Sequence, residues 1–423
     1  MIKRLKPKSE FSRNVLTLMT GTALAQALPI AVAPILTRIY TPEDFGLLAL
    51  FLAVFAVLSA VVTGRYEMAV MAQENEFQAE NMVFLSILVA LTMLVLTGLP
   101  VLFFSREIAV LLGDERIEFW LYFLPILLFA SGVYQSIDYW LNRQKKYRNM
   151  AGNKLLKAGG ISLVQLLVGY VNSAGLIIGS LVGWSLATLF VVKRSKLNFN
   201  VFNWKEIKRL GVRHRDYPLF QAPFSVLNSL STQAPIFFIM KFFEASMVGF
   251  FSMVNKILSA PAALIAKSIG QVFFQRISEH ARQSPELLMG DILHVALKLL
   301  VIALLVFSPV LFLGPEIFSV VFGEEWGVAG EFAQVLVFAV VVKFVVSPLS
   351  IVFLAIDKIR VGSLWQFIYF ISTSVMLFIV YEYEYEYEMF LWIYVIHEVI
   401  LYSLYFVFII YSVRSFNAIN KKI

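Results

Sequence analysis

Long apolar runs separated by short polar segments fill the whole chain. A helix that crosses a bilayer needs about 20 mostly apolar residues. Twelve runs reach that length, and we predict a membrane-spanning helix in each: roughly 13–37, 43–66, 78–103, 117–142, 152–171, 174–194, 217–241, 247–272, 290–313, 328–355, 358–380 and 388–412. The pattern predicts an all-α polytopic membrane protein, because no segment between the runs is long enough for a separate folded domain.

Composition supports the same fold class. Of the 423 residues, 59% are hydrophobic and 15% are charged, and the mean hydropathy is +0.78. Soluble domains contain about 25% charged residues, so this composition excludes a soluble protein and also a soluble domain on a single anchor. The chain has no cysteine and four scattered histidines. We therefore expect no disulfide, metal site or cofactor.

The distribution of basic residues predicts the orientation in the membrane. If both termini are cytoplasmic, 28 of the 35 lysines and arginines fall on the cytoplasmic side, 4 fall on the opposite side and 3 lie within spans. Cytoplasmic loops of membrane proteins carry an excess of lysine and arginine, so we expect both termini in the cytoplasm. The net charge of +7 then reflects topology, and we expect no nucleic-acid partner.

The chain divides near its most basic loop, 193–215, into two sets of six predicted spans. We assign them to an N-terminal lobe, 1–204, and a C-terminal lobe, 205–423. A short internal repeat supports this division, because LTRIYTPEDFG at 36–46 aligns with IMKFFEASMVG at 239–249 at a constant offset of 203. Since six spans is an even number, both halves enter the membrane from the same side. Two-lobed transporters of this kind place the substrate site between the lobes.

Four segments resemble one family of membrane transporters, in order and with similar spacing. They are LTRIYTPEDFGLLALF at 36–51, GRYEMAV at 64–70, RDYPLFQAPFSVLNSLSTQAPIFFI at 215–239 and VGFFSMVNKILSAPAALIAKSIGQVFFQ at 248–275. The family is the polysaccharide transporter, or O-antigen flippase (Wzx-like), family of the multidrug/oligosaccharidyl-lipid/polysaccharide exporter superfamily. The resemblance extends from about residue 10 to about residue 410.

The resemblance implies a MATE-like fold and a function that the residues alone do not indicate. It implies a flippase without enzymatic activity that moves an undecaprenyl-diphosphate-linked oligosaccharide from the cytoplasmic to the periplasmic leaflet by alternating access. It places the chain in the bacterial inner membrane, in O-antigen, capsule or exopolysaccharide biosynthesis. The implied partners are a polysaccharide polymerase and chain-length machinery. The first, second, seventh and eighth spans are implied to line a central cavity.

Polar residues within the spans are candidates for substrate contact. A charged residue at a helix centre costs about 2.5–3.5 kcal/mol, so such residues usually face a cavity. In the eighth span, Ser252, Lys256, Ser259 and Lys267 share one helix face, and a cationic stripe suits a diphosphate. The candidate diphosphate contacts are Lys256, Arg65, Lys267, Arg38 and Lys241. The alternative for Lys256 is an ion pair that locks the helix in place.

Neutral polar residues on the seventh span repeat this pattern without charge. They either bind sugar hydroxyls or join helices to one another. The candidate polar cavity residues are Ser252, Ser259, Gln221, Ser225, Asn228 and Thr232. The candidates for ion coupling are Asp138, Glu67, Lys298, Lys343 and Glu398.

Most of these charges also have a structural interpretation. Arg38 and Lys241 occupy matching positions in the repeat and are also suited to anchor helix ends at the membrane interface. The alternative ion pairs are Arg65 with Glu67, Asp138 with Arg143 or Lys145, and Glu398 with Lys298 or Lys343.

Three other functions compete with the flippase. A drug antiporter predicts an acidic cavity, whereas the ionisable residues within these spans are mostly lysines. A polyprenyl-dependent polymerase or ligase predicts a long periplasmic loop, which this chain lacks. A scaffold for polysaccharide assembly gains nothing from lysines in its spans. No Walker sequence occurs, so transport would use an ion gradient, the lipid gradient or removal of the product.

Overall fold

The computed structural model describes the backbone of residues 10–420. It describes their side chains except in 10–16, 261–272, 359–360, 362–363 and 419–420. The chain forms two compact units, Met1–Gly249 and Phe250–Ile423. This grouping rests on packing alone, so the division into lobes 1–204 and 205–423 stays a prediction.

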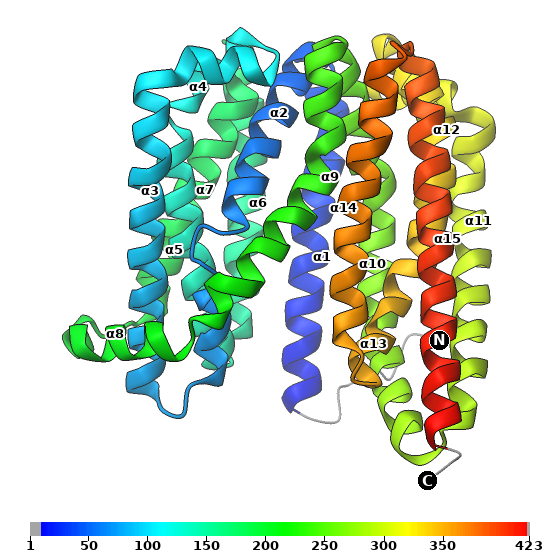
Figure 1. Ribbon diagram of the computed structural model, residues 1–423. Helices are drawn as coiled ribbons and strands as arrows, with labels where there is room; N and C mark the ends of the chain where they lie inside the picture. The colour runs from blue at the N-terminus through cyan, green and yellow to red at the C-terminus, as the bar shows by residue number, and fades with distance from the viewer. Residues whose placement is uncertain (1–9, 421–423) are drawn as a thin grey trace. The chain divides into compact units, whose positions relative to one another are not determined.

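The first unit is a bundle of long helices with one short helix across its end. Its core is formed by side chains of α3, α5 and α7 together with Leu210 of α8, which is fully buried. In Figure 1, α3, α5 and α7 run side by side, and α8 lies crosswise at the end of α3. The helices are α1 (Glu10–Leu36), α2 (Pro42–Ser59), α3 (Glu76–Leu112), α4 (Glu118–Leu121), α5 (Leu124–Arg143), α6 (Tyr147–Gly169), α7 (Gly175–Ser195), α8 (Trp204–Arg213) and α9 (Ala222–Phe242).

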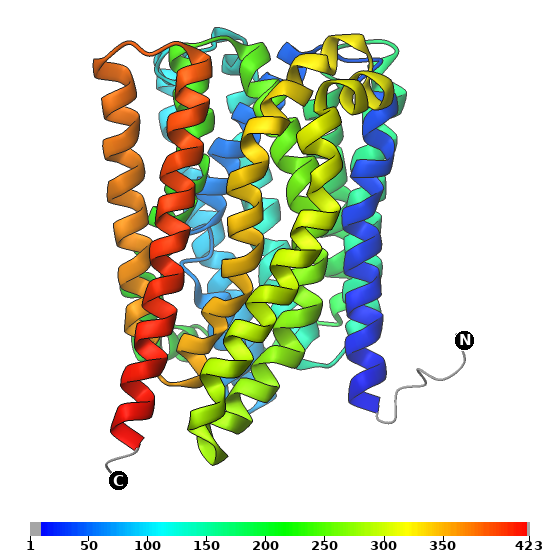
Figure 2. The same ribbon diagram turned by 90° about the vertical axis from the view of Figure 1, so that its right-hand side faces the viewer.

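The second unit is also helical. Its core joins side chains from α10, α11, α14 and α15 around the short segment between α12 and α13. Figure 2 shows α14 and α15, drawn in orange and red, running next to each other. The helices are α10 (Ala245–Gln283), which starts in the first unit, α11 (Leu288–Phe322), α12 (Gly327–Val346), α13 (Val352–Ala355), α14 (Ile359–Glu382) and α15 (Tyr387–Asn420).

The number of long helices agrees with the twelve predicted spans. Among the described residues, eight helices are long and apolar enough to cross a membrane, and the bent pair that includes α5 adds a ninth. Three more helices are less apolar but long enough, namely α6, α9 and α10, with 23, 21 and 39 residues. The predicted all-α polytopic fold is confirmed.

Several predicted spans have the wrong end. The third, eighth and ninth were expected to end at residues 103, 272 and 313, but α3, α10 and α11 continue to Leu112, Gln283 and Phe322. The second was expected to continue to residue 66, but α2 ends at Ser59 and a turn follows. Gly64 and Arg65 then adopt left-handed backbone conformations, with φ of 59° and 63°. A right-handed helix cannot contain two such residues. The helix is therefore interrupted within the apolar run, and a 3₁₀ helix, Tyr66–Ala72, follows the interruption.

Local sequence also explains a kink in α11. The helix bends at Leu313, where φ is −128°. Pro315 has no backbone N–H, so it cannot bond the carbonyl of Leu311 four residues earlier. The side chain of Gln334 in α12 donates a hydrogen bond to that carbonyl, at 3.1 Å. The kink is thus stabilised by a neighbouring helix, as expected in a lipid environment, where a free carbonyl is costly.

Candidate functional site

The polar stripe predicted on the eighth span lies on α10. Lys256 and Ser259 are exposed and Ser252 is half-buried, whereas Met253 and Val254 on the other side are buried. The fourth member of the stripe, Lys267, has a side chain outside the described residues. In the described part of the stripe, Lys256 and Ser259 thus form an exposed polar face, whereas Ser252 is partly covered by protein.

Lys256 has no carboxylate partner among the described side chains. It belongs to none of the ion pairs found there, and no hydrogen bond from its ammonium group is present among those residues. The alternative of a structural lock therefore has no partner in that part of the chain. An unpaired ammonium in an apolar helix is stable where it meets water or an anion.

A second lysine within a span, Lys343, has a different environment. Its ammonium lies 2.8 Å from a carboxylate oxygen of Glu398, which is fully buried. The hydroxyl of Tyr369 donates to the other oxygen of Glu398 at 2.6 Å. Lys343 also lies over the rings of Tyr394 and Tyr402, 5.7 and 5.6 Å from their centroids. The predicted pairing of Glu398 with one of two lysines is confirmed for Lys343.

This group of residues links three helices of the second unit. Lys343 comes from α12, Tyr369 from α14 and Glu398 from α15. The remaining candidate, Lys298 on α11, is exposed and takes part in no ion pair among the described side chains. The charge of Lys343 is therefore compensated by Glu398, whereas the charge of Lys298 has no such partner among the described side chains.

The neutral stripe on the seventh span lies at the start of α9 and along it. Gln221, Asn228 and Thr232 are exposed, and Ser225 is half-buried. The hydroxyls of Ser225 and Thr232 donate to carbonyls of their own helix segment, at 2.8 and 2.9 Å. Exposure disfavours a role in joining helices. The side-chain amides of Gln221 and Asn228, in contrast, form no hydrogen bond within the described part of the chain.

Arg65 lies directly after the break that follows α2. One of its guanidinium nitrogens is 3.6 Å from Glu67, whose side chain is 1% exposed, while that of Arg65 is 29% exposed. Thr63 donates a hydrogen bond to the second oxygen of Glu67. The structure therefore contains the alternative ion pair that the sequence left open. It also leaves part of the guanidinium exposed.

Arg38 and Lys241 both donate to backbone carbonyls at helix ends. A guanidinium nitrogen of Arg38 bonds the carbonyl of Pro34 in the last turn of α1. The ammonium of Lys241 bonds the carbonyl of Val110 in the last turn of α3, at 2.7 Å. Cations stabilise the negative end of a helix dipole. Both contacts fit the interpretation of these residues as anchors of helix ends.

Neither alternative ion-pair partner of Asp138, Arg143 or Lys145, pairs with it among the described side chains. The cations whose charges act on this carboxylate are Lys154 and Lys157 of α6. Arg143 instead donates to the carbonyls of Val70 and Met71, at 3.1 and 3.3 Å.

Lys157 was not identified from the sequence. Its ammonium lies 3.8 Å from the centre of the Trp184 ring on α7 and 5.1 Å from that of Tyr134 on α5. Together with Asp138 these residues connect α5, α6 and α7. The available sequence signal was a lysine inside the predicted span 152–171, but its aromatic neighbours depend on how three helices pack.

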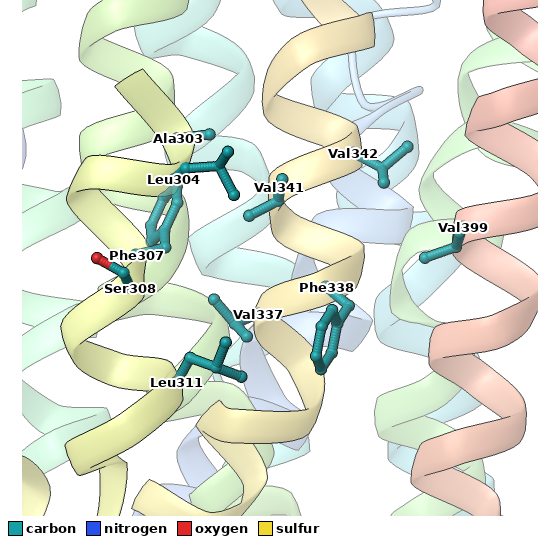
Figure 3. Close-up of a pocket in the computed structure, with 10 residues that line it drawn as sticks. All are labelled: Ala303, Leu304, Phe307, Ser308, Leu311, Val337, Phe338, Val341, Val342 and Val399. Carbon is teal, nitrogen blue, oxygen red and sulfur yellow. The ribbon is translucent and has the colours of Figure 1, made fainter. Parts of the chain in front are cut away.

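An apolar pocket between α11, α12 and α15 differs from these polar faces. Figure 3 shows Leu304, Phe307 and Leu311 on one side and Val337 and Phe338 on the other. The cavity measures about 210 Å³, and Ser308 supplies its hydroxyl. Such a lining suits hydrocarbon and offers little to a sugar or a diphosphate.

Most of the chain matches a known protein family. Residues 35–331 match the model of a family described as polysaccharide biosynthesis protein. The chain belongs to this family. A curated relative is the succinoglycan biosynthesis transport protein ExoT of Rhizobium meliloti (strain 1021), 25% identical over 328 residues. The match covers 73% of this polysaccharide biosynthesis protein and 61% of the relative, so the chain spans less than two thirds of that relative's length.

Solved structures resemble the whole fold. An inward-facing multidrug resistance MATE transporter of the MOP superfamily matches with a TM-score of 0.73 at 16% identity, over 95% of this chain and 96% of the other. The lipid II flippase MurJ matches with 0.72 at 14%, over 96% and 87%. A MOP superfamily transporter from Pyrococcus furiosus matches with 0.64 at 14%, over 96% of each chain. At these identities the likeness concerns the fold alone.

These comparisons confirm the predicted family and fold class. The polysaccharide biosynthesis protein has the fold of MATE transporters and MurJ, and it is a multi-pass protein of the bacterial inner membrane.

Proposed function

We propose that this protein is a flippase that moves a polyprenyl-diphosphate-linked oligosaccharide from the cytoplasmic to the periplasmic leaflet by alternating access. The observation that supports it most directly is Lys256, an exposed cation on the polar face of α10 with no carboxylate partner among the described side chains. A diphosphate carries at least two negative charges and is shared by all lipid carriers of this class. A lysine is a suitable point charge for such a group.

The polar residues divide between the two parts of such a substrate. We assign the diphosphate to Lys256, and we keep Arg65 and Lys267 as further candidates, although the side chain of Lys267 lies outside the described residues. Arg38 and Lys241 are weaker candidates, because their charged groups already bond helix-end carbonyls. We assign the sugars to the exposed amides of Gln221 and Asn228 on α9, where neutral donors and acceptors match hydroxyl groups.

The substrate is assigned by class. The relative ExoT is described as a succinoglycan transport protein and MurJ as a lipid II flippase. The first description concerns transport in the biosynthesis of a polysaccharide, and the second concerns the flipping of a lipid. They favour a polysaccharide repeat unit, for an exopolysaccharide as well as for O-antigen or capsule. We place both termini in the cytoplasm from the distribution of lysine and arginine, and we expect a polymerase and chain-length machinery to use the product.

A drug antiporter is the second candidate, because MATE transporters share the fold. The charges disfavour it. Glu398 is paired with Lys343. A cationic drug would need a carboxylate in its binding site, whereas the charge exposed on the polar face of α10 is the positive one of Lys256. We also propose that the protein is not an enzyme, since its relatives and neighbours are described as transporters or flippases.

Deleting the gene in its host and restoring it with variants tests the proposal. Deletion is expected to remove the surface polysaccharide and to accumulate intact lipid-linked repeat units on the cytoplasmic face. Lys256→Ala should fail to restore polymer at normal protein level, and Lys256→Arg should restore most of it. Lys193→Ala is the matched control, because it removes an exposed lysine of α7 that is not a candidate for contact with substrate or ion. Accumulation of repeat units on the periplasmic face, or an unchanged surface, would overturn the proposal.

A further inference from the structure

A groove separate from the polar faces lies in the corner between α3 and α8. Its volume is about 560 Å³. One wall is a face of α3 formed by Leu85, Leu88 and Val89, which we call the α3 wall. The other side is α8, which lies across the end of α3 in Figure 1. An acyl chain beside a membrane-crossing helix and a headgroup beside an interfacial helix would occupy such a corner.

The orientation of α8 is fixed by several contacts. Its buried residues Ile207 and Leu210 pack into the first unit. The hydroxyl of Tyr66 donates to the carbonyl of Gly211 at 3.1 Å. Before the helix, the side chain of Asn81, in α3, bonds the carbonyl of Val201 at 3.0 Å. The residues that α8 presents to the groove are therefore set by the fold.

The residues of α8 at the groove combine aromatic, apolar and cationic groups. Trp204 and Val212 are 54% and 70% exposed. Lys208 is exposed and lies 5.4 Å from the centre of the Trp204 ring, and Arg215, just after the helix, is exposed as well. Tryptophan and basic residues together are typical of the membrane interface.

The two cations at the groove differ from the two arginines of α8, which are paired. Arg209 pairs with Glu206 at 2.6 Å, and Arg213 pairs with Glu74 at 3.0 Å. Lys208 and Arg215 belong to no ion pair among the described side chains. Two uncompensated cations at the end of an apolar wall are complementary to one molecule that carries a phosphate next to hydrocarbon.

We propose that this groove binds an anionic phospholipid, with its phosphate at Lys208 and Arg215 and an acyl chain along the α3 wall. The two free oxygens of a phosphodiester accept hydrogen bonds from the two cations. The site extends beyond the proposed transport function, because it needs only that the chain is embedded in a bilayer.

Native mass spectrometry of the full-length protein in detergent tests this site with defined lipids. The wild type is expected to retain phosphatidylglycerol over phosphatidylcholine. Each basic residue near an anionic lipid contributes about five-fold in affinity, so Lys208→Gln with Arg215→Gln should weaken phosphatidylglycerol binding about 25-fold. The matched control is Lys205→Gln with Arg209→Gln, which removes the same charge from α8 outside the groove. It should weaken binding much less than the groove variant, because Lys205 and Arg209 do not line the groove.

A second variant tests the groove without changing charge. Leu88→Trp fills the α3 wall and should reduce retention of phosphatidylglycerol, while gel filtration and the melting temperature show that the protein is folded. Equal losses in the two double variants would indicate diffuse attraction and overturn a defined site. Equal retention of phosphatidylcholine, or unchanged binding in Leu88→Trp, would also overturn it. Displacement of phosphatidylglycerol by equimolar undecaprenyl phosphate would assign the groove to the substrate carrier instead.

Discussion

Gly46 and Gly249, the last matched pair of the internal repeat, make reciprocal contacts. A β-carbon on Gly46 would lie 1.9 Å from the carbonyl oxygen of Ala245, and one on Gly249 would lie 1.9 Å from that of Pro42. Pro42 and Ala245 are themselves matched at the offset of 203. Gly46 therefore packs against Ala245, and its repeat equivalent Gly249 packs against Pro42, the repeat equivalent of Ala245. A local two-fold axis requires such reciprocal contacts.

This contact predicts that neither glycine tolerates a side chain. Gly46→Ala or Gly249→Ala forces two buried backbones apart, and overpacking of this kind costs about 1–3 kcal/mol. The melting temperature of the purified protein should fall for both variants. Gly290→Ala is the control, because no atom lies within 4 Å of a β-carbon at that position in α11. Equal melting temperatures in all three variants would contradict the contact.

The pair of Lys343 and Glu398 predicts a charge-dependent effect on stability. Lys343→Met leaves the buried carboxylate uncompensated, which costs about 3–5 kcal/mol for a broken buried pair. The double variant Lys343→Met with Glu398→Gln removes both charges and should recover most of the loss. Unfolding in denaturant measures both. Lys298→Met, which affects an exposed lysine with no ion pair among the described side chains, should stay within about 0.5 kcal/mol.

The kink in α11 predicts that the loss of stability caused by replacing Gln334 depends on the presence of Pro315. Gln334→Leu leaves the carbonyl of Leu311 without its partner and should destabilise the protein by about 1–3 kcal/mol. Pro315→Ala restores a backbone N–H that can bond the same carbonyl. In that background Gln334→Leu should cost clearly less. Additive losses in the double variant would show that the glutamine acts in another way.

His214 predicts a loss of stability in acid. Its pKa is lowered, first by burial and then by the charge of Arg213. The amide nitrogen of Gln73 lies 3.0 Å from its ring, which must accept that hydrogen bond and therefore be neutral. The folded state thus binds fewer protons than the unfolded state. The contribution of neutral His214 to stability is present above the unfolded pKa of about 6.5 and decreases as the pH falls below that value.

Comparing His214→Gln with the wild type between pH 8 and pH 5 measures this contribution. The wild type should lose more stability than the variant over that interval, since glutamine does not titrate. Parallel curves would show that the ring accepts no such hydrogen bond.

The sequence was sufficient to predict the fold class and the helix count, because each span is an apolar run of the required length. It did not predict the end of α2, since Gly64 and Arg65 interrupt the helix inside an apolar run. It identified Lys343 and Glu398 as possible partners, because charges in lipid must be compensated. It did not predict that the lysines of α6 act on Asp138, because this depends on how α6 packs on α5, which no sequence spacing encodes.

The separation of Lys343 from Glu398 along the chain has a consequence for biogenesis. The two residues are 55 positions apart, since 398 − 343 = 55, and α15 is the last helix described. A ribosome makes α12 well before the carboxylate that neutralises its lysine. During that interval α12 enters the membrane with an uncompensated ammonium. We therefore expect chains that stop after α14 to be less stable in the membrane than chains that include α15, because Lys343 then lacks the carboxylate of Glu398.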